Sequence, residues 1–195
     1  TYYGINTLSG NMIRANRSRL KNPNGLILGT PGAGKSFSVK REILDCFLTT
    51  PDDIIICDPE GEYFPLVSAL HGQLIRIASN SEQHINPMDI PIDDYMFSNP
   101  MEVIANKSDF LISLCEIIVG GRYGLSAEER SVIDKCVQRI YKHFIENNPT
   151  EETMPLLSDL QRELHEEGEV ALRVANSLEM FVNGSQNLFN HRTNI

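Results

Sequence analysis

The sequence has no apolar run that approaches the roughly 20 residues needed to cross a bilayer, which argues against an integral membrane protein. Its four cysteines form no Cys-x-x-Cys pair, and three lie within apolar runs, as free thiols in a reducing, cytoplasmic setting do. The five histidines lack the spacing of metal ligands, and no Gly-x-Ser-x-Gly motif marks a nucleophilic serine. These absences argue against a zinc protein and a serine hydrolase.

Acidic residues are absent from the first 41 residues, although that segment contains seven lysines and arginines. The rest of the chain contains 10 basic and 26 acidic residues. A basic segment suits contact with phosphate groups, nucleic acid or anionic lipid, but it also suits an ordinary solvated surface. The acidic remainder argues against non-specific binding to nucleic-acid backbones, which requires many basic side chains on one surface.

The order of apolar segments predicts a single α/β domain. Short apolar runs at residues 25–28, 54–57 and 73–77 are expected to be strands, and helical periodicity follows the first two. This order predicts a parallel sheet with right-handed crossovers. From about residue 100 the periodicity is entirely helical. Four helices are expected there, over residues 101–119, 126–147, 156–167 and 169–183.

The second of these helices has the clearest start signal. Ser126 and Glu129 are placed as a capping box, in which each side chain bonds the other residue's backbone amide. The apolar stripe that follows, from Val132 to Phe144, is typical of a helix face buried in a core.

The segment Gly29–Ser36 matches the phosphate-binding motif Gly-x-x-x-x-Gly-Lys-Ser in full. It lies between a predicted strand and a predicted helix, where the helix N-terminus adds about half a positive charge. Lys35 is expected to reach the β- and γ-phosphates, and the Ser36 hydroxyl to bind Mg²⁺. The motif therefore predicts ATP and Mg²⁺ as cofactors. The predicted binding residues are Gly29, Thr30, Pro31, Gly32, Ala33, Gly34, Lys35, Ser36 and Phe37.

Three acidic residues follow the second predicted strand, in the segment Asp58–Tyr63, which reads Asp-Pro-Glu-Gly-Glu-Tyr. Strand ends are where α/β sheets place their ligands. In one interpretation Asp58 holds Mg²⁺ through water and Glu60 activates the attacking water. In a second, they belong to an accessory acidic strand that acts on the metal and water from the side. Both make Asp58 and Glu60 candidate catalytic residues with Lys35, and Asp58 a candidate metal ligand with Ser36. In a third, the segment is a turn in which Asp58 or Glu60 caps a helix.

Arg122 lies in the glycine-rich segment 120–124, between two predicted helices. Such a joint is flexible, because glycine tolerates many backbone conformations. Arg122 is either a solvated loop residue or an arginine finger that reaches the nucleotide of a neighbouring subunit.

Four segments follow one another in a distinctive order: Gly29–Ser36, Asp58–Tyr63, Ile85–Pro87 and Gly124–Arg130. In this order they resemble the CagE/TrbE/VirB family, the conjugation ATPases of type IV secretion within the FtsK and HerA superfamily. The resemblance covers about Gly4 to Thr193. Its most specific element is the acidic segment, since the phosphate-binding loop alone fits many ATPases.

The resemblance implies a RecA-like P-loop domain interrupted by an all-α insertion. Residues 1–95 would form the first half of the α/β core, 96–185 the insertion, and 186–195 the return to the core. It also implies a bacterial ATPase that powers transfer of protein and DNA. Such an enzyme would be cytoplasmic and peripheral at the inner face of the cell membrane, with other channel subunits as partners and a homo-hexamer as the full-length assembly.

One departure from the family affects the expected activity. The family's catalytic strand is an apolar run ending in Asp-Glu after the helical insertion, and no such run lies between Asn183 and Ile195. We therefore expect a fragment, truncated before that strand, that binds ATP with little hydrolysis. Two alternatives stay open: a DNA-pumping motor or coupling protein of the same superfamily, and a non-catalytic, nucleotide-dependent assembly module. The excess of acidic over basic residues favours the secretion ATPase over the DNA pump.

Overall fold

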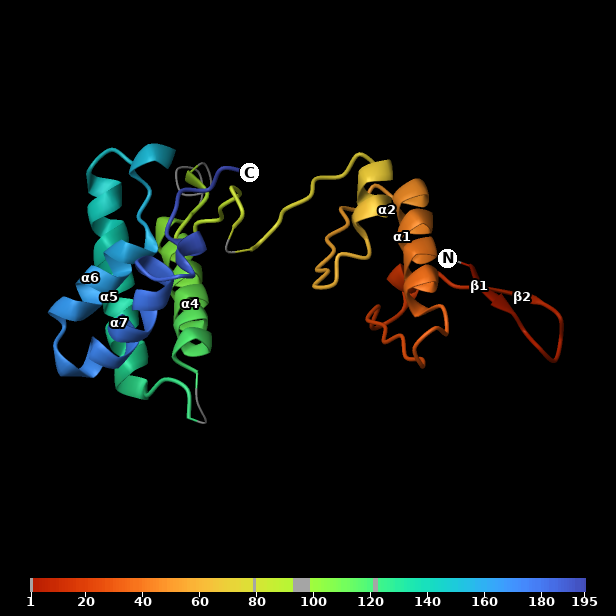
Figure 1. Ribbon diagram of the computed structural model, residues 1–195, viewed down its shortest axis with the longest axis horizontal. Helices are drawn as coiled ribbons and strands as arrows, with labels where there is room; N and C mark the ends of the chain where they lie inside the picture. The colour runs from red at the N-terminus through yellow and green to blue at the C-terminus, as the bar shows by residue number, and fades with distance from the viewer. Residues whose placement is uncertain (1, 79, 93–98, 121–122) are drawn as a thin grey trace. The chain divides into compact units, whose positions relative to one another are not determined.

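The computed structural model describes residues 2–78, 80–92, 99–120 and 123–195. The chain forms two compact units, Thr1–Leu74 and Ile75–Ile195 (Figure 1). Among the described residues, no helix is long and apolar enough to cross a membrane. The predicted position of Arg122 and the predicted boundary near residue 95 lie outside the described residues.

The first unit begins with an antiparallel hairpin of β1 (Tyr2–Ile5) and β2 (Met12–Arg14). Its turn is ordered by the Asn6 side chain, which accepts hydrogen bonds from the amides of Leu8 and Ser9. The short helix η1 (Arg17–Arg19), α1 (Lys35–Thr49) and α2 (Phe64–Ala69) follow. Both helices after the predicted strands are thus confirmed.

A cluster of polar contacts holds the hairpin on α1. The Tyr3 hydroxyl donates to Glu42 at 3.0 Å and accepts from the Arg17 guanidinium at 2.8 Å. Arg17 also pairs with Glu42 at 3.0 Å, which closes a triangle of three side chains. Arg41 donates to the Tyr2 carbonyl at 3.0 Å. Two of the seven basic residues in the acid-free segment therefore serve internal packing.

The predicted parallel sheet is not confirmed. Segments 25–28, 54–57 and 73–77 have no regular secondary structure, and within the described part of the chain β1 and β2 are the only paired strands. A strand leaves its amides and carbonyls unpaired until a neighbouring strand accepts them, so apolar sequence alone cannot form a sheet. Several of their side chains are exposed, since Leu26 is 82% and Ile55 96% accessible to solvent, whereas Ile54 and Ile56 are half-buried.

The second unit is helical, and the four helices predicted from sequence are confirmed (Figure 1). They are α4 (Pro100–Val119), α5 (Ala127–Glu146), α6 (Leu157–Glu166) and α7 (Glu169–Val182), with the short helices η2 (Glu151–Thr153) and η3 (Asn187–Phe189) beside them. Helix α4 packs on α5 and α7, and α6 packs on the same two helices.

One apolar core joins the four helices. Each contributes fully buried side chains, and each buried leucine or isoleucine is worth about 1.5–3 kcal/mol. Two cysteines belong to this core. Burial raises the pKa of the Cys115 thiol to about 12 and that of Cys136 to about 11, so both thiols are inert and act as small apolar groups.

The two ends of the helical unit lie side by side. The Asn86 side chain is buried, donates to Asp89 at 2.7 Å and to the Pro155 carbonyl at 2.8 Å, and accepts from the Met88 amide. The Asn86 amide donates to the Thr193 hydroxyl at 2.8 Å. The Ile85–Pro87 segment singled out in the sequence thus fastens the entry of this unit to its exit.

The predicted capping box of Ser126 and Glu129 is present. Glu129 also forms an ion pair with α7. Its carboxylate accepts from the Ser126 amide at 2.7 Å and from the Arg173 guanidinium of α7 at 2.7 and 2.6 Å. The hydrogen bond from Arg173 is the main reason that the pKa of this buried carboxyl falls from 4.5 to about 2. Arg173 also donates to the Gly124 carbonyl, so the pair ties α7 to the start of α5.

We predict that Glu129→Gln destabilises the helical unit by about 1–3 kcal/mol at neutral pH. Glutamine keeps the cap but leaves Arg173 without its carboxylate. Because the pKa of Glu129 is lower in the folded than in the unfolded chain, its stabilisation is complete above pH 4.5 and is lost as the pH falls toward 2. The variant should lose less stability over this interval.

Urea unfolding followed by circular dichroism at several pH values measures this effect. The control is Glu128→Gln, which removes an exposed carboxylate from the same helical turn. The same pH dependence in the wild-type chain and the Glu129→Gln variant would show that the ion pair does not carry the stability assigned to it.

Candidate functional site

The predicted phosphate-binding loop immediately precedes α1. Residues 29–34 are exposed, and α1 begins at Lys35. Gly32 and Gly34 have φ angles of 79° and 80°, a left-handed conformation that side-chain-bearing residues adopt at a cost. These two glycines therefore let the backbone reverse direction, so that successive amides of the loop can point toward one centre.

The start of α1 supplies further donors. The first intrahelical bond runs from the Ser38 amide to the Gly34 carbonyl at 3.0 Å, so the amides of Lys35, Ser36 and Phe37 have no acceptor within the helix. Together with the helix dipole, these amides form a site that favours anions. Lys35 and Ser36 are half-buried there, and Phe37 is exposed.

Lys35 bends back over the loop. Its ammonium donates to the Thr30 carbonyl at 3.0 Å, and the Ala33 amide donates to the same carbonyl at 3.1 Å. The lysine side chain thus lies across the loop that precedes it. An incoming phosphate, being charged, is a stronger acceptor for this ammonium than a neutral carbonyl.

The Asp58 carboxylate organises the acidic segment from within. It accepts hydrogen bonds from the amides of Glu60 at 3.3 Å, Gly61 at 3.0 Å and Tyr63 at 2.8 Å. A carboxylate offers about four lone-pair positions, so these three bonds leave room for about one further donor, such as water. Such contacts characterise a turn that leads into a helix, here α2, and they leave Glu60 exposed.

The structure also shows a contact that the sequence motifs did not predict. The Lys40 ammonium lies 5.3 Å from the centroid of the Tyr63 ring, a cation–π contact between α1 and the acidic segment. The four-residue spacing of Ser36 and Lys40 was the one sequence signal that bears on it, because it places both residues on the same face of the helix.

The acidic segment and the phosphate-binding loop are not joined directly. Among the described residues, no hydrogen bond or ion pair joins Asp58 or Glu60 to Lys35 or Ser36.

The donor set suits a nucleotide with Mg²⁺. The described residues contain no group of three or more His, Cys, Asp or Glu side chains that could hold a metal ion. Mg²⁺ rarely needs such a group, because it keeps several waters and binds through substrate phosphates and one or two protein oxygens. The Ser36 hydroxyl lies at the start of α1 beside the amides that favour an anion, which is where a phosphate-bound Mg²⁺ would need a protein oxygen.

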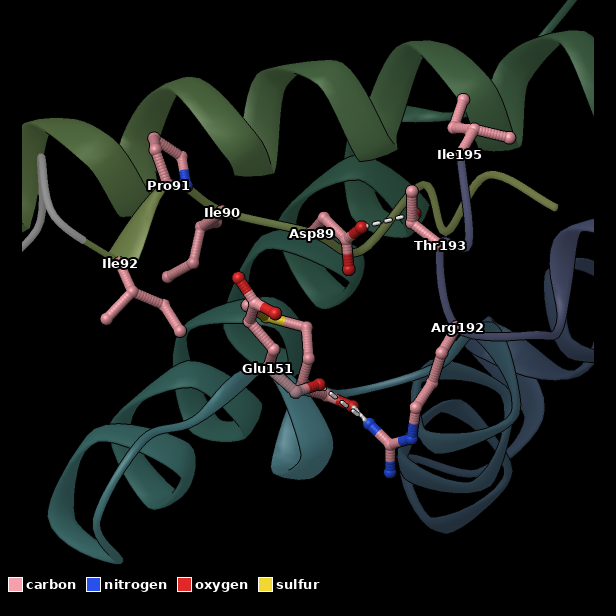
Figure 2. A pocket seen from close by; sticks show the side chains of 9 residues that line it. Asp89, Ile90, Pro91, Ile92, Glu151, Arg192, Thr193 and Ile195 are labelled. Carbon is pink, nitrogen blue, oxygen red and sulfur yellow. Dashed lines mark hydrogen bonds between the residues drawn. The ribbon is translucent and has the colours of Figure 1, made fainter. Parts of the chain in front are cut away.

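The helical unit has a hollow of about 420 Å³, lined by Asp89, Ile90, Pro91, Ile92, Glu151, Met154, Arg192, Thr193 and Ile195 (Figure 2). Its polar side chains already join chain segments. Asp89 accepts from Asn86 and from the Thr193 hydroxyl, and Arg192 donates to the carbonyls of Glu151 and Met154. These contacts close the helical unit and present no converging set of groups for a ligand.

A glycine loop followed by a helix that starts with lysine and serine is the phosphate-binding element of the P-loop nucleoside triphosphatases. Residues 24–195 match the family described as "Helicase HerA, central domain". The chain therefore belongs to this family.

A solved structure of VirB4 from Thermoanaerobacter pseudethanolicus shares the fold. The TM-score is 0.71 at 22% sequence identity, and the match covers 96% of this chain and 51% of that chain. This likeness supports a RecA-like ATPase fold, and with the family match it confirms the predicted resemblance. No curated protein matches the chain.

Proposed function

We propose that this chain is the ATP-binding part of an ATPase that powers substrate transfer through, or assembly of, a conjugation or type IV secretion channel. The observation that carries the proposal is the glycine loop at the start of α1, which has the backbone reversal and the lysine that a triphosphate requires. The HerA family match and the VirB4-like fold support an ATPase that uses ATP to do mechanical work. The chain spans about half of that VirB4 chain, so substrate and partners are part of the proposal.

In this proposal the loop amides bind phosphate oxygens, and Lys35 moves from the Thr30 carbonyl to the β- and γ-phosphates. The Ser36 hydroxyl holds Mg²⁺, which neutralises phosphate charge when bound. Asp58 and Glu60 act as accessory acids that orient water near the metal. The contacts of Asp58 support this role, since its carboxylate retains one outer position while the loop amides fix it.

The wider architecture belongs to the same proposal. Residues 1–95 form the first half of the P-loop core, 96–185 the helical insertion and 186–195 the return to the core. The full-length protein assembles as a homo-hexamer with other channel subunits, at the cytoplasmic face of the membrane. Exposed apolar residues of the first unit, such as Leu26 and Ile55, support burial against further protein in that assembly.

A DNA-pumping motor or coupling protein is the second candidate, because the matched family is described by a helicase. The charge distribution opposes it, since 26 acidic residues exceed 17 basic ones and Arg17 and Arg41 serve internal packing. Affinity for single- and double-stranded DNA, measured between 50 and 200 mM salt, separates the candidates. The secretion ATPase should bind weakly, whereas a pump should bind tightly with affinity falling about 10³-fold or more over this range.

We predict that Lys35→Ala lowers ATP affinity by at least about 10-fold, because the charge-assisted hydrogen bonds to phosphate are lost. The fold should survive, since the lysine bonds a single exposed carbonyl. Isothermal titration with ATP and Mg²⁺ measures the affinity, and circular dichroism checks the fold. Lys142→Ala, at an exposed position of α5, is the matched control. Unchanged affinity in a folded Lys35→Ala chain would remove Lys35 from the site.

We also predict that the 195-residue chain binds ATP but hydrolyses it very slowly, and that Glu60→Gln changes this residual rate little. An accessory acid does not deprotonate the attacking water, whereas a general base contributes about 10²–10⁴ in rate. Phosphate release measured over a wide protein concentration range tests this, with Glu62→Gln as the control in the same loop. Robust turnover that only Glu60→Gln abolishes would make Glu60 the catalytic base instead.

A further inference from the structure

Lys40 is placed for a different task from Lys35. It lies five residues farther along α1, about 7–8 Å along the helix axis. That displacement carries it beyond the helix N-terminus at which phosphate is bound. It lies instead one turn after Ser36 on the same helix face, because residues four apart are neighbours on a helix surface.

Tyr63 receives Lys40 and connects it to the acidic segment. The lysine ammonium lies over the tyrosine ring, 5.3 Å from its centroid. The Tyr63 amide donates the shortest of the three hydrogen bonds to the Asp58 carboxylate, at 2.8 Å. The Tyr63 carbonyl accepts from the Val67 amide at 3.0 Å, in the first turn of α2. One residue thus joins Lys40, the Asp58 carboxylate and the start of α2.

We propose that Lys40 is a positioning residue: through the Tyr63 ring it holds the Asp58–Tyr63 loop against the face of α1 that carries Ser36. This inference rests on the proposed function, in which Ser36 and Asp58 act on the same nucleotide-bound Mg²⁺. The contact chain keeps the Asp58 carboxylate at a set position relative to the Ser36 hydroxyl before nucleotide binds. In this role Lys40 contacts the Tyr63 ring and is not itself a ligand of phosphate or metal.

Four variants isolate this contact. Lys40→Met removes the charge with little change in length, and Lys40→Arg restores a cation that stacks well on aromatic rings. Tyr63→Leu removes the ring, whereas Tyr63→Phe keeps it. Lys142→Met, at an exposed site of α5, controls for the loss of one positive charge.

The first readout is hydrogen exchange at the amides of Gly61 and Tyr63 without nucleotide. A cation–π contact at a partly exposed site should change the loop population by about 2–5-fold. Lys40→Met and Tyr63→Leu should therefore speed exchange at both amides by this factor, while Lys40→Arg, Tyr63→Phe and Lys142→Met should match the wild-type chain. Unchanged exchange in Lys40→Met would overturn the proposal.

The second readout is ATP affinity by isothermal titration, with Mg²⁺ and with EDTA. Lys40→Met should weaken binding by about 2–5-fold with Mg²⁺ and leave binding in EDTA unchanged, since the phosphate loop is intact. Equal weakening in both conditions would overturn the positioning role and make Lys40 a phosphate ligand. Failure of the wild-type chain to bind ATP would refute the proposed function instead, and the exchange measurement would still decide whether Lys40 holds the loop.

Discussion

Backbone amides and carbonyls need hydrogen-bonding partners, and this requirement governs both units of the chain. The helical unit satisfies it locally: α4, α5, α6 and α7 pair their own backbones and bury one apolar core between them. The apolar segments of the first unit cannot do so, because a strand needs a neighbour. They remain without regular structure, and several of their side chains, such as Leu26 and Ile55, are exposed to solvent.

The same requirement creates the candidate site. The first amides of α1 have no acceptor within the helix, and the loop before it turns through two glycines with positive φ. These unpaired donors are the binding capacity of the loop. In the acidic segment the protein takes the opposite course, since Asp58 uses its own carboxylate to satisfy three loop amides. The amides at the start of α1 therefore remain available to an anion, whereas three amides of the acidic segment are already bonded to Asp58.

Four of the seven basic residues in the acid-free N-terminal segment contact other parts of the same unit. Arg17 and Arg41 fasten the β1–β2 hairpin to α1, Lys35 lies over its own loop, and Lys40 lies over Tyr63. Each of these cations has a defined local contact. The segment therefore contributes order around α1, the helix on which the proposed binding residues begin, and offers limited support for a nucleic-acid surface.

Residue patterns alone were enough to predict the phosphate-binding motif, the helices α1, α4, α5, α6 and α7, and the capping box at Ser126, because each depends on contacts between residues close in the chain. The parallel sheet predicted from the apolar segments is not confirmed, because the pairing of strands depends on segments distant in the chain. Three contacts become visible only in the folded chain: the Asn86 amide bonds Thr193, Arg173 completes the Glu129 cap, and Lys40 lies over Tyr63. These contacts join residues 23 to 107 positions apart, and no local pattern encodes which distant partner a side chain will meet.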